Sequence, residues 1–351
     1  MSATATYPVL KGWPRHWPAG VAPLAESGRD WPRVTLVTPC RNQAPFIEDA
    51  ILSVLNQGYP HLEYMVFDAG SDDGSAEIIG RFSSRLAYWE SQLDRGQSHA
   101  INKGWARASG RYVWWLNGDD MLAPGALFHS VESLEAQPGV DLVYGDLVNV
   151  DDRGRPLSLY PSWEFDLADF LARGRHVTQP GALMRREVLE RIGSLDESLH
   201  YLMDTDYWIR LALAGGTLVH LPSVLALFRV HQQAKTQTGS MAAVEERYLL
   251  NRRIYASPDL PTGVRVMRAQ ITSRMHLECA RAYLKLGAFR STLSEAGLAV
   301  KAWPRRLLDT GLWWHLALGM LGLAVGQRVW LRLRQCLRQS RRIDDTTLGT
   351  E

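Results

Sequence analysis

The segment 113–120, Val-Trp-Trp-Leu-Asn-Gly-Asp-Asp, most constrains how this chain can fold. It begins as an apolar run and ends abruptly in an amide, a glycine and two carboxylates. A short apolar run bounded by turn residues is typical of a buried strand in a parallel sheet. Ligands of open α/β sheets bind beyond the carboxyl ends of such strands, where two carboxylates can hold a hard divalent cation. Taken alone, the segment fits a solvated turn equally well.

Strand and helix patterns alternate through the first 120 residues. Residues 34–38 are β-branched or apolar and predict a strand, and residues 62–67 predict another. Between them, the apolar side chains of residues 46–55 recur at helical spacing. This alternation predicts an α/β fold with a mostly parallel sheet flanked by helices. In such a sheet Asp68 and Asp119, which each follow a strand, lie at the same edge.

The pattern changes further along the chain. We expect helices at 124–137, 186–192 and 204–212, and strands at 140–144, 217–220 and 226–230. From about residue 241 the pattern is helical to the end. The sequence therefore predicts an irregular lead-in over 1–32, an α/β domain over 33–240 and a helical C-terminal extension over 241–351.

The composition is that of an ordinary globular protein. Of the 351 residues, 22% are charged and 46% are hydrophobic, and the net charge of +2 points to no particular partner. We expect no nucleic-acid partner. The cysteines Cys40, Cys279 and Cys336 are too far apart for a disulfide framework or a metal-ligand spacing, which favours a reducing compartment. The N-terminus lacks the basic-then-apolar pattern of a signal peptide.

Several motifs of residues 33–240 together resemble the family 2 glycosyltransferases of the GT-A fold. The matching pieces are Val-Thr-Pro-Cys-Arg-Asn at 37–42, Ser-Val-Leu-Asn-Gln at 53–57, Asp-Ala-Gly-Ser-Asp-Asp-Gly-Ser at 68–75, Asp-Arg-Gly-Gln-Ser-His-Ala-Ile-Asn-Lys-Gly at 94–104 and Leu-Asn-Gly-Asp-Asp at 116–120. Their order and spacing are highly specific together. The resemblance implies an inverting, metal-dependent hexosyltransferase of a bacterial surface-polysaccharide pathway. Its donor would be a nucleotide-diphosphate sugar with Mg²⁺ or Mn²⁺, and its acceptor a glycan or lipid-linked glycan.

The resemblance also implies roles for individual residues. Asp68 would bind the nucleotide base, with Pro39 and Arg41 lining the same pocket. Asp119 would hold the metal, and Asp204 would be the general base. The other implied positions are Gln97, His99, Asn117 and Gly118 at the donor, His231 at the metal or diphosphate, and Gln179-Pro180-Gly181 as an acceptor-side loop.

Other interpretations of these residues remain open. Asn117 stands where the metal motif usually begins with Asp, which leaves a weaker ligand set. From its position alone, Asp204 fits a helix N-cap, and His231 fits a strand-end histidine. One alternative function is a nucleotidyltransferase, although residues 40–43 do not form a glycine-rich phosphate loop. Another is a non-catalytic scaffold that binds sugar nucleotides through a decayed metal site.

The C-terminal extension contains an uncharged segment, residues 311–326, that includes Trp313 and Trp314. It is shorter than the about 20 residues that a membrane span needs. Basic residues flank it on both sides: Lys301, Arg305 and Arg306 before it and the arginines of 328–342 after it. This pattern favours an interfacial helix on an anionic membrane surface, so that the protein would be cytoplasmic and peripheral at the inner face of the cell membrane. A helix packed on the catalytic domain is the alternative.

Overall fold

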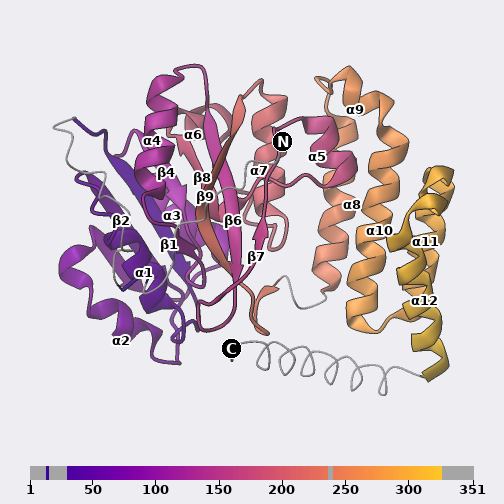
Figure 1. Cartoon of the computed structure of the whole chain (residues 1–351), viewed down its shortest axis with the longest axis horizontal. Helices are drawn as coiled ribbons and strands as arrows, with labels where there is room; N and C mark the ends of the chain where they lie inside the picture. The colour runs from indigo at the N-terminus through magenta and orange to yellow at the C-terminus, as the bar shows by residue number, and fades with distance from the viewer. Residues whose placement is uncertain (1–12, 16–29, 236–239, 326–351) are drawn as a thin grey trace, which may run out of the picture. The chain divides into compact units, whose positions relative to one another are not determined.

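The computed structural model describes residues 13–15, 30–235 and 240–325 (Figure 1). The chain divides into two compact units. The first comprises Met1–Phe170 and Gly174–His231, and the second comprises Leu171–Arg173 and Gln232–Glu351. Each unit is described by itself.

In the described part of the first unit, nine strands form one sheet in the order β3-β2-β1-β4-β8-β6-β9-β5, with β7 paired to β6 (Figure 1). The strands are β1 Val34–Cys40, β2 Leu62–Asp68, β3 Tyr88–Ser91, β4 Tyr112–Trp115, β5 Met121–Leu122, β6 Leu142–Val150, β7 Pro156–Tyr160, β8 Ala182–Arg185 and β9 Leu218–Arg229. The helices are α1 Ile47–Leu55, α2 Ser75–Gly80, α3 Gln97–Arg107, α4 Ala126–Ala136, α6 Glu187–Ile192 and α7 Met203–Leu213, with short 3₁₀ turns η2 Ser83–Arg85 and η3 Gln179–Gly181. Helix α5 Leu167–Arg173 begins in the first unit, and its residues Leu171–Arg173 belong to the second.

The half of the sheet formed by β3, β2, β1 and β4 is parallel throughout. All seven residues of β1 are buried, as expected for a strand covered on both faces. Cys40 pairs with Asp68 at the ends of β1 and β2, and Leu116 N donates to Val37 O at 3.0 Å just beyond β4. The α/β class is therefore confirmed, and the loops after β1, β2 and β4 leave the sheet at one edge.

Beyond β4 the sheet is mixed. Strand β8 runs antiparallel to both β4 and β6, whereas β9 runs parallel to β6 and antiparallel to β5. The prediction of two strands at 217–220 and 226–230 is wrong, because both belong to the continuous strand β9. The pairing of β9 with β6 steps from Leu221 to Val224, which leaves Pro222 in an irregularity of the ladder. Proline is tolerated at such bulges, so it does not end the strand here.

The two tryptophans of β4 point to opposite faces of the sheet, as alternation along a strand requires. Trp114 belongs to a core cluster with residues of α1 and α4, such as Ile51 and Phe128. On the other face Trp115 meets Trp105 of α3, with ring centroids 5.4 Å apart, and stacks on Trp208 of α7 at 5.5 Å. Helices on both faces thus fix β4 and the turn that follows it.

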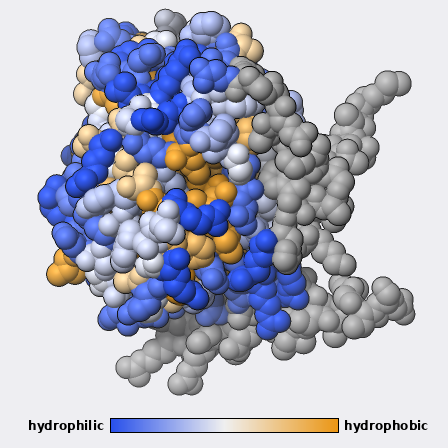
Figure 2. All heavy atoms as spheres, turned by 90° about the vertical axis from the view of Figure 1, so that its left-hand side faces the viewer, coloured by the Kyte–Doolittle hydropathy of each residue, from blue (hydrophilic) through white to orange (hydrophobic). Residues whose placement is uncertain are grey.

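On the side where α1 and α2 lie in Figure 1, Figure 2 shows mostly hydrophilic residues around one central apolar area.

The described part of the second unit is helical. Its helices are α8 Met241–Ala256, α9 Thr262–Val266, α10 Arg268–Leu286, α11 Phe289–Ala302 and α12 Thr310–Val325, with η5 Pro304–Leu308 before α12. Val244 of α8 packs against Met275 and Cys279 of α10. Leu277 of α10 forms a second cluster with Ala296 and Ala299 of α11 and Leu312 of α12. Within the described ranges, every helix is too short or too polar to cross a membrane.

Candidate active site

The turn after β4 is built around the buried carboxylate of Asp120. Its Oδ2 accepts from Asn117 Nδ2 at 3.2 Å, and its Oδ1 accepts from Arg229 N at 3.1 Å. Burial, and next the negative charge of neighbouring Asp119, raise the pKa of Asp120 well above its ordinary range. Of the two acids, Asp120 therefore shapes the turn, and Asp119 is the one left with a partly exposed carboxylate.

Asp119 lies beside His231, as the resemblance implied for two residues near one metal. His231 Nε2 is 3.0 Å from Asp119 Oδ2, and the side chains are 8% and 18% exposed respectively. The His231 ring packs on Phe46, which precedes α1, with ring centroids 4.6 Å apart. A carboxylate oxygen and an imidazole nitrogen are thus held together at the edge where β4 and β9 end.

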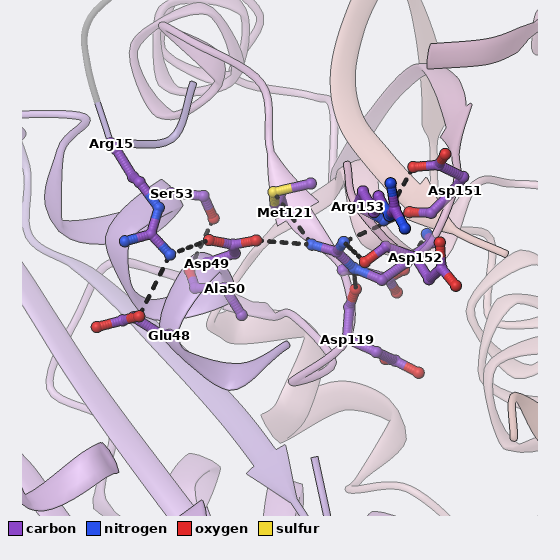
Figure 3. A network of polar contacts seen from close by, with 12 residues as sticks. Arg15, Glu48, Asp49, Ala50, Ser53, Asp119, Met121, Asp151, Asp152 and Arg153 are labelled. Atoms are coloured by element: carbon purple, nitrogen blue, oxygen red, sulfur yellow. Dashed lines mark hydrogen bonds and ion pairs between the residues drawn. The ribbon is translucent and has the colours of Figure 1, made fainter. Parts of the chain in front are cut away.

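Arg229 binds the backbone of Asp119, and the sequence did not identify it as a separate functional residue. Figure 3 shows Asp49, Asp119 and Asp152 in one network of polar contacts. The guanidinium of Arg229 is almost fully buried and donates to Asp119 O at 3.0 Å, to Asp152 O at 3.0 Å and to Asp49 Oδ2 at 3.2 Å. It also lies 5.0 Å from the centre of the Phe46 ring. One side chain therefore joins α1, the turn after β4 and the turn between β6 and β7. The available signal was an arginine directly after the apolar run 224–228.

Asp68 lies at the end of β2 and is 1% exposed. Its carboxylate accepts from Ser71 N at 2.9 Å, from Ser91 Oγ at 2.6 Å and from Ser71 Oγ. Of the two residues predicted beside it, Pro39 is buried in β1 and Arg41 is exposed just after β1. The strand pairing thus brings all three predicted base-binding residues to adjacent strand ends.

Asn42 holds the loops after β1 and β2 together and was also not predicted. Its φ of 52° lies in the left-handed region, which asparagine tolerates better than most residues. Asn42 N donates to Ser71 Oγ at 2.8 Å, and Asn42 Oδ1 accepts from Asp72 N at 3.1 Å. The loop that carries Arg41 is therefore fixed to the loop that carries Asp68.

The first turn of α3 brings Gln97 to the turn after β4. Gln97 Nε2 donates to Asn117 Oδ1 at 2.7 Å. His99 was predicted to contact the sugar donor. Its Nδ1 accepts from Arg95 N at 3.4 Å, within the same segment of the chain. At Gly118 an added Cβ would lie 2.2 Å from Gln43 Oε1, so glycine allows the loop after β1 to approach this turn. Gly118 therefore has a packing role that the sequence did not indicate.

Asp204 lies in the first turn of α7, where Leu202 and not Asp204 holds the N-cap position. Its Oδ1 accepts from Thr205 N at 2.6 Å. The start of α7 packs on the start of α3, because Ser98 Oγ lies 2.9 Å from Met203 Sδ. Asp204 thus belongs to the segment that adjoins the first turn of α3. By contrast, Asp206 pairs with Arg210 Nε at 2.8 Å and is a structural acid.

The side-chain atoms of Asp119 and His231 could serve as ligands of a divalent cation that also binds the substrate. Asp119 and His231 supply one oxygen and one nitrogen at adjacent positions. Within the described ranges, no group of three His, Cys, Asp or Glu side chains could enclose a metal ion. Magnesium-type ions commonly bind through one or two protein carboxylates together with substrate phosphates and water, and do not need a complete protein cage. Asn117 directs its side chain to Gln97, Asp120 and Gln179 instead.

Known proteins resemble this chain in sequence and in fold. The family model for glycosyl transferase family 2 matches residues 35–193. An uncharacterised glycosyltransferase of Rickettsia typhi is 27% identical over 214 residues, which cover 59% of this chain and 67% of the relative. The O-antigen biosynthesis protein RfbC of Myxococcus xanthus is 27% identical over 219 residues, which cover 60% of this chain and 17% of that longer protein.

Two solved structures share the fold at low sequence identity. S. aureus TarS 1-349 in complex with UDP-GlcNAc superposes with a TM-score of 0.60 at 17% identity, covering 86% of this chain and 92% of the other. The mannosyltransferase PcManGT from Pyrobaculum calidifontis, in complex with GDP-Man and Mn²⁺, has a TM-score of 0.54 at 20% identity, covering 85% and 90%. Together with the sheet edge described above, the sequence match makes residues 35–193 of this chain similar to glycosyl transferase family 2 and supports a role in glycosyl transfer.

Proposed function

We propose that this chain is an inverting hexosyltransferase that moves a sugar from a nucleotide-diphosphate sugar to a hydroxyl of a glycan or lipid-linked glycan. The observation that carries the proposal is the Asp119–His231 pair, 3.0 Å apart at the carboxyl edge of the parallel strands. Asp68 lies at the same edge, two strands away from β4. The edge thus offers separate groups for a diphosphate and for a nucleoside. The RfbC relative, named for O-antigen biosynthesis, supports a role in making a surface polysaccharide.

In the proposed donor complex, Asp68 hydrogen-bonds the base, and Pro39 and Arg41 line its pocket. Asp119 and His231 hold Mg²⁺ or Mn²⁺ with the diphosphate. When bound, the cation neutralises the negative charge that develops on the leaving diphosphate. The complexes of the two structural neighbours with UDP-GlcNAc and with GDP-Man and Mn²⁺ support this class of donor and cofactor.

On the acceptor side, Asp204 is the proposed general base. The acceptor oxygen forms a bond to the anomeric carbon while the bond from that carbon to the diphosphate oxygen breaks. The hydroxyl proton passes to the Asp204 carboxylate, and the nucleoside diphosphate leaves with the electron pair. Because attack and departure occur on opposite faces of the same carbon, the anomeric configuration is inverted. A partly exposed carboxylate in the first turn of α7 supports this role.

The experiment that tests the base compares Asp204→Asn with Asp206→Asn in the same helix. Asp204→Asn should lower kcat by on the order of 100-fold to 10,000-fold, since it removes a proton acceptor at constant volume, with donor affinity retained. Asp206→Asn should instead lower the melting temperature, because Asp206 is buried and paired with Arg210. Near-wild-type turnover of Asp204→Asn would mean that the base lies elsewhere.

The metal proposal is tested by calorimetry of UDP-, GDP- and dTDP-sugars with Mn²⁺ or Mg²⁺. A donor present at 100 times its dissociation constant should stabilise the folded chain by about 2.7 kcal/mol. Asp119→Ala should abolish the dependence of donor binding on metal, and an unchanged response would contradict the assignment. A product that retains the nucleotidyl group would indicate a nucleotidyltransferase. Donor binding without turnover, in the presence of membranes and acceptor lipids, would indicate a scaffold.

We also propose that the enzyme is cytoplasmic and peripheral at the inner face of the cell membrane. The support is the exposed side of α12, where Trp313, Trp314, Met320 and Leu321 are between 48% and 64% exposed and recur at helical spacing. The opposite side packs through Leu312 on α11. Leu308 of η5 is 86% exposed. The lipid that fits is anionic, because Lys301 and Arg305 are exposed just before this apolar surface. The arginines of 328–342 lie outside the described residues.

Co-sedimentation with liposomes tests the membrane proposal. The full-length chain should bind vesicles that contain anionic lipid, and binding should weaken as salt is raised. Trp313→Ser with Trp314→Ser should reduce binding without unfolding, since both side chains are mostly exposed, whereas Met241→Ser on α8 is the matched control for an exposed apolar residue. Equal binding of the double variant and wild type, or no preference for anionic over neutral vesicles, would contradict the proposal.

A further inference from the structure

Three side-chain amides form a continuous hydrogen-bonded chain across the turn after β4. Gln97 Nε2 donates to Asn117 Oδ1 at 2.7 Å, and Asn117 Nδ2 donates to Gln179 Oε1 at 3.1 Å. Gln179 Nε2 in turn donates to Trp115 O at 2.8 Å. The three residues come from α3, from the turn after β4 and from η3. We refer to Gln97, Asn117 and Gln179 as the amide chain.

The direction of the amide chain is fixed by the groups at its ends. Trp115 O is a backbone carbonyl and can only accept, so Gln179 must present its NH₂ group there and its oxygen to Asn117. Asn117 must then donate to Gln179, and the same NH₂ group also lies 3.2 Å from Asp120 Oδ2. Aspartate at position 117 would present an acceptor to Gln179 Oε1 in place of a donor. The amide at 117 is therefore what this arrangement needs.

The amide chain connects the segments on the two sides of Asp119. On one side, the first turn of α3 contacts the start of α7, where Ser98 Oγ lies 2.9 Å from Met203 Sδ and Asp204 follows directly. On the other side, η3 is buried, and Pro180 O accepts from Trp114 Nε1 at 3.0 Å. A shift of any one of the three segments would break a hydrogen bond of the amide chain.

We propose that Gln97, Asn117 and Gln179 are positioning residues that hold Asp119 at a fixed separation from the Asp204 segment and from η3. This inference rests on the function proposed above, in which Asp119 faces the donor and Asp204 the acceptor. In-line displacement depends steeply on the placement of the reacting groups, and a misplacement of about 1 Å can lower the rate by on the order of 100-fold. Asn117 then acts as a hydrogen-bond donor between two segments, and not as a weakened metal ligand.

The test uses the full-length variants Asn117→Asp and Gln179→Ala. Each should lower kcat for transfer by on the order of 100-fold, with little change in metal-dependent donor affinity by calorimetry, and each should raise the ratio of donor hydrolysis to transfer. The matched control is Gln57→Ala. Gln57 is also a buried amide and donates to Ser53 O and Ala123 O at 2.9 Å each. It should lower the melting temperature without changing that ratio.

A second readout does not depend on turnover. A double-mutant cycle of Asn117→Ala and Gln179→Ala should show non-additive shifts in the urea midpoint, because the two side chains share a hydrogen bond. If wild type transfers no sugar from any donor, the proposed function fails while the cycle still reports the amide chain. Additive shifts would overturn the amide chain itself. Non-additive shifts with wild-type kcat and wild-type hydrolysis ratio in both single variants would overturn the positioning role.

Discussion

Replacing the buried guanidinium of Arg229 should destabilise the first unit far more than its contact with one carboxylate would indicate. Arg229→Met keeps most of the apolar stem but removes the donors to Asp49, Asp119 O and Asp152 O. Removing one partner of a buried ion pair costs about 3 to 5 kcal/mol. The expected loss lies near the lower bound, about 3 kcal/mol, because Asp49 is 20% exposed and keeps a second partner, Arg15, at 3.3 Å.

Arg15 supplies the matched control, since it binds the same carboxylate from the surface. The Arg15 side chain is 58% exposed, whereas that of Arg229 is 1% exposed. An exposed ion pair is worth about 0 to 1 kcal/mol, so Arg15→Ala should barely change stability. The loss of stability in Arg229→Lys should lie between those of Arg229→Met and Arg15→Ala. One ammonium group cannot bind both carbonyls and the carboxylate as the planar guanidinium does.

The assay is thermal and urea unfolding of the three variants beside wild type. For a domain of about 200 residues, 3 kcal/mol corresponds to a fall in melting temperature of about 6 to 12 °C. The proposed metal-dependent binding of the sugar donor should also weaken in Arg229→Met, since Arg229 holds the backbone of Asp119. If Arg229→Met melts within the error of Arg15→Ala, the buried network contributes no more than a surface pair, and the reasoning is refuted.

Two further predictions concern packing and thiol reactivity. Gly104→Ala should destabilise the protein, because the new Cβ in α3 would lie 2.5 Å from Val37 Cγ2 of β1. Gly297→Ala in α11 meets nothing within 4 Å and should stabilise by up to about 1 kcal/mol. A rise in the urea midpoint of Gly104→Ala, or a fall in that of Gly297→Ala, would contradict this. Burial raises the pKa of the Cys40 and Cys279 thiols above the ordinary range. For Cys40 the negative charge of Asp68 is the next cause. With Cys336 replaced by serine, a thiol reagent at pH 8 should label these two cysteines only after denaturation, and rapid labelling of the folded protein would contradict their burial.

The parallel half of the sheet could be predicted from the sequence because its signals are local. The strand at 62–67 and the helix over 46–55 each show their period within a few residues. In the mixed half, the strand predicted at 140–144 overlaps β6. The continuity of β9 could not be predicted, since Pro222 interrupts its pattern and only its pairing with β6 shows that the strand continues. Proline usually separates strands, and the bulge that accommodates it depends on a partner far away in the sequence.

The sequence named candidate site residues but not all of the residues that hold them in place. The family motifs indicated Asp119 and His231, and the fold brings these two side chains together although 112 positions separate them. Arg229 has ordinary sequence surroundings and acquires its role only through contacts with distant segments. Gln179, which the resemblance placed in an acceptor-side loop, likewise meets Asn117 only in the folded chain. Asn117 appeared to be a weakened ligand for the same reason, because its two amide partners are 20 and 62 positions away.

The position of β9 near the end of the first unit has a consequence for synthesis on the ribosome. The parallel half of the sheet is complete once β4 has emerged from the ribosome. Asp49 of α1, however, pairs with Arg229, which is synthesised 180 residues later. Until β9 joins the sheet, β6 lacks its parallel neighbour and the turn that bears Asp119 lacks its buried support. Pairings at such sequence separation form late, because loop closure must precede them. A nascent chain that stops before residue 218 should therefore hold a structured first half without a competent site, so that donor binding appears only in its last stage of folding.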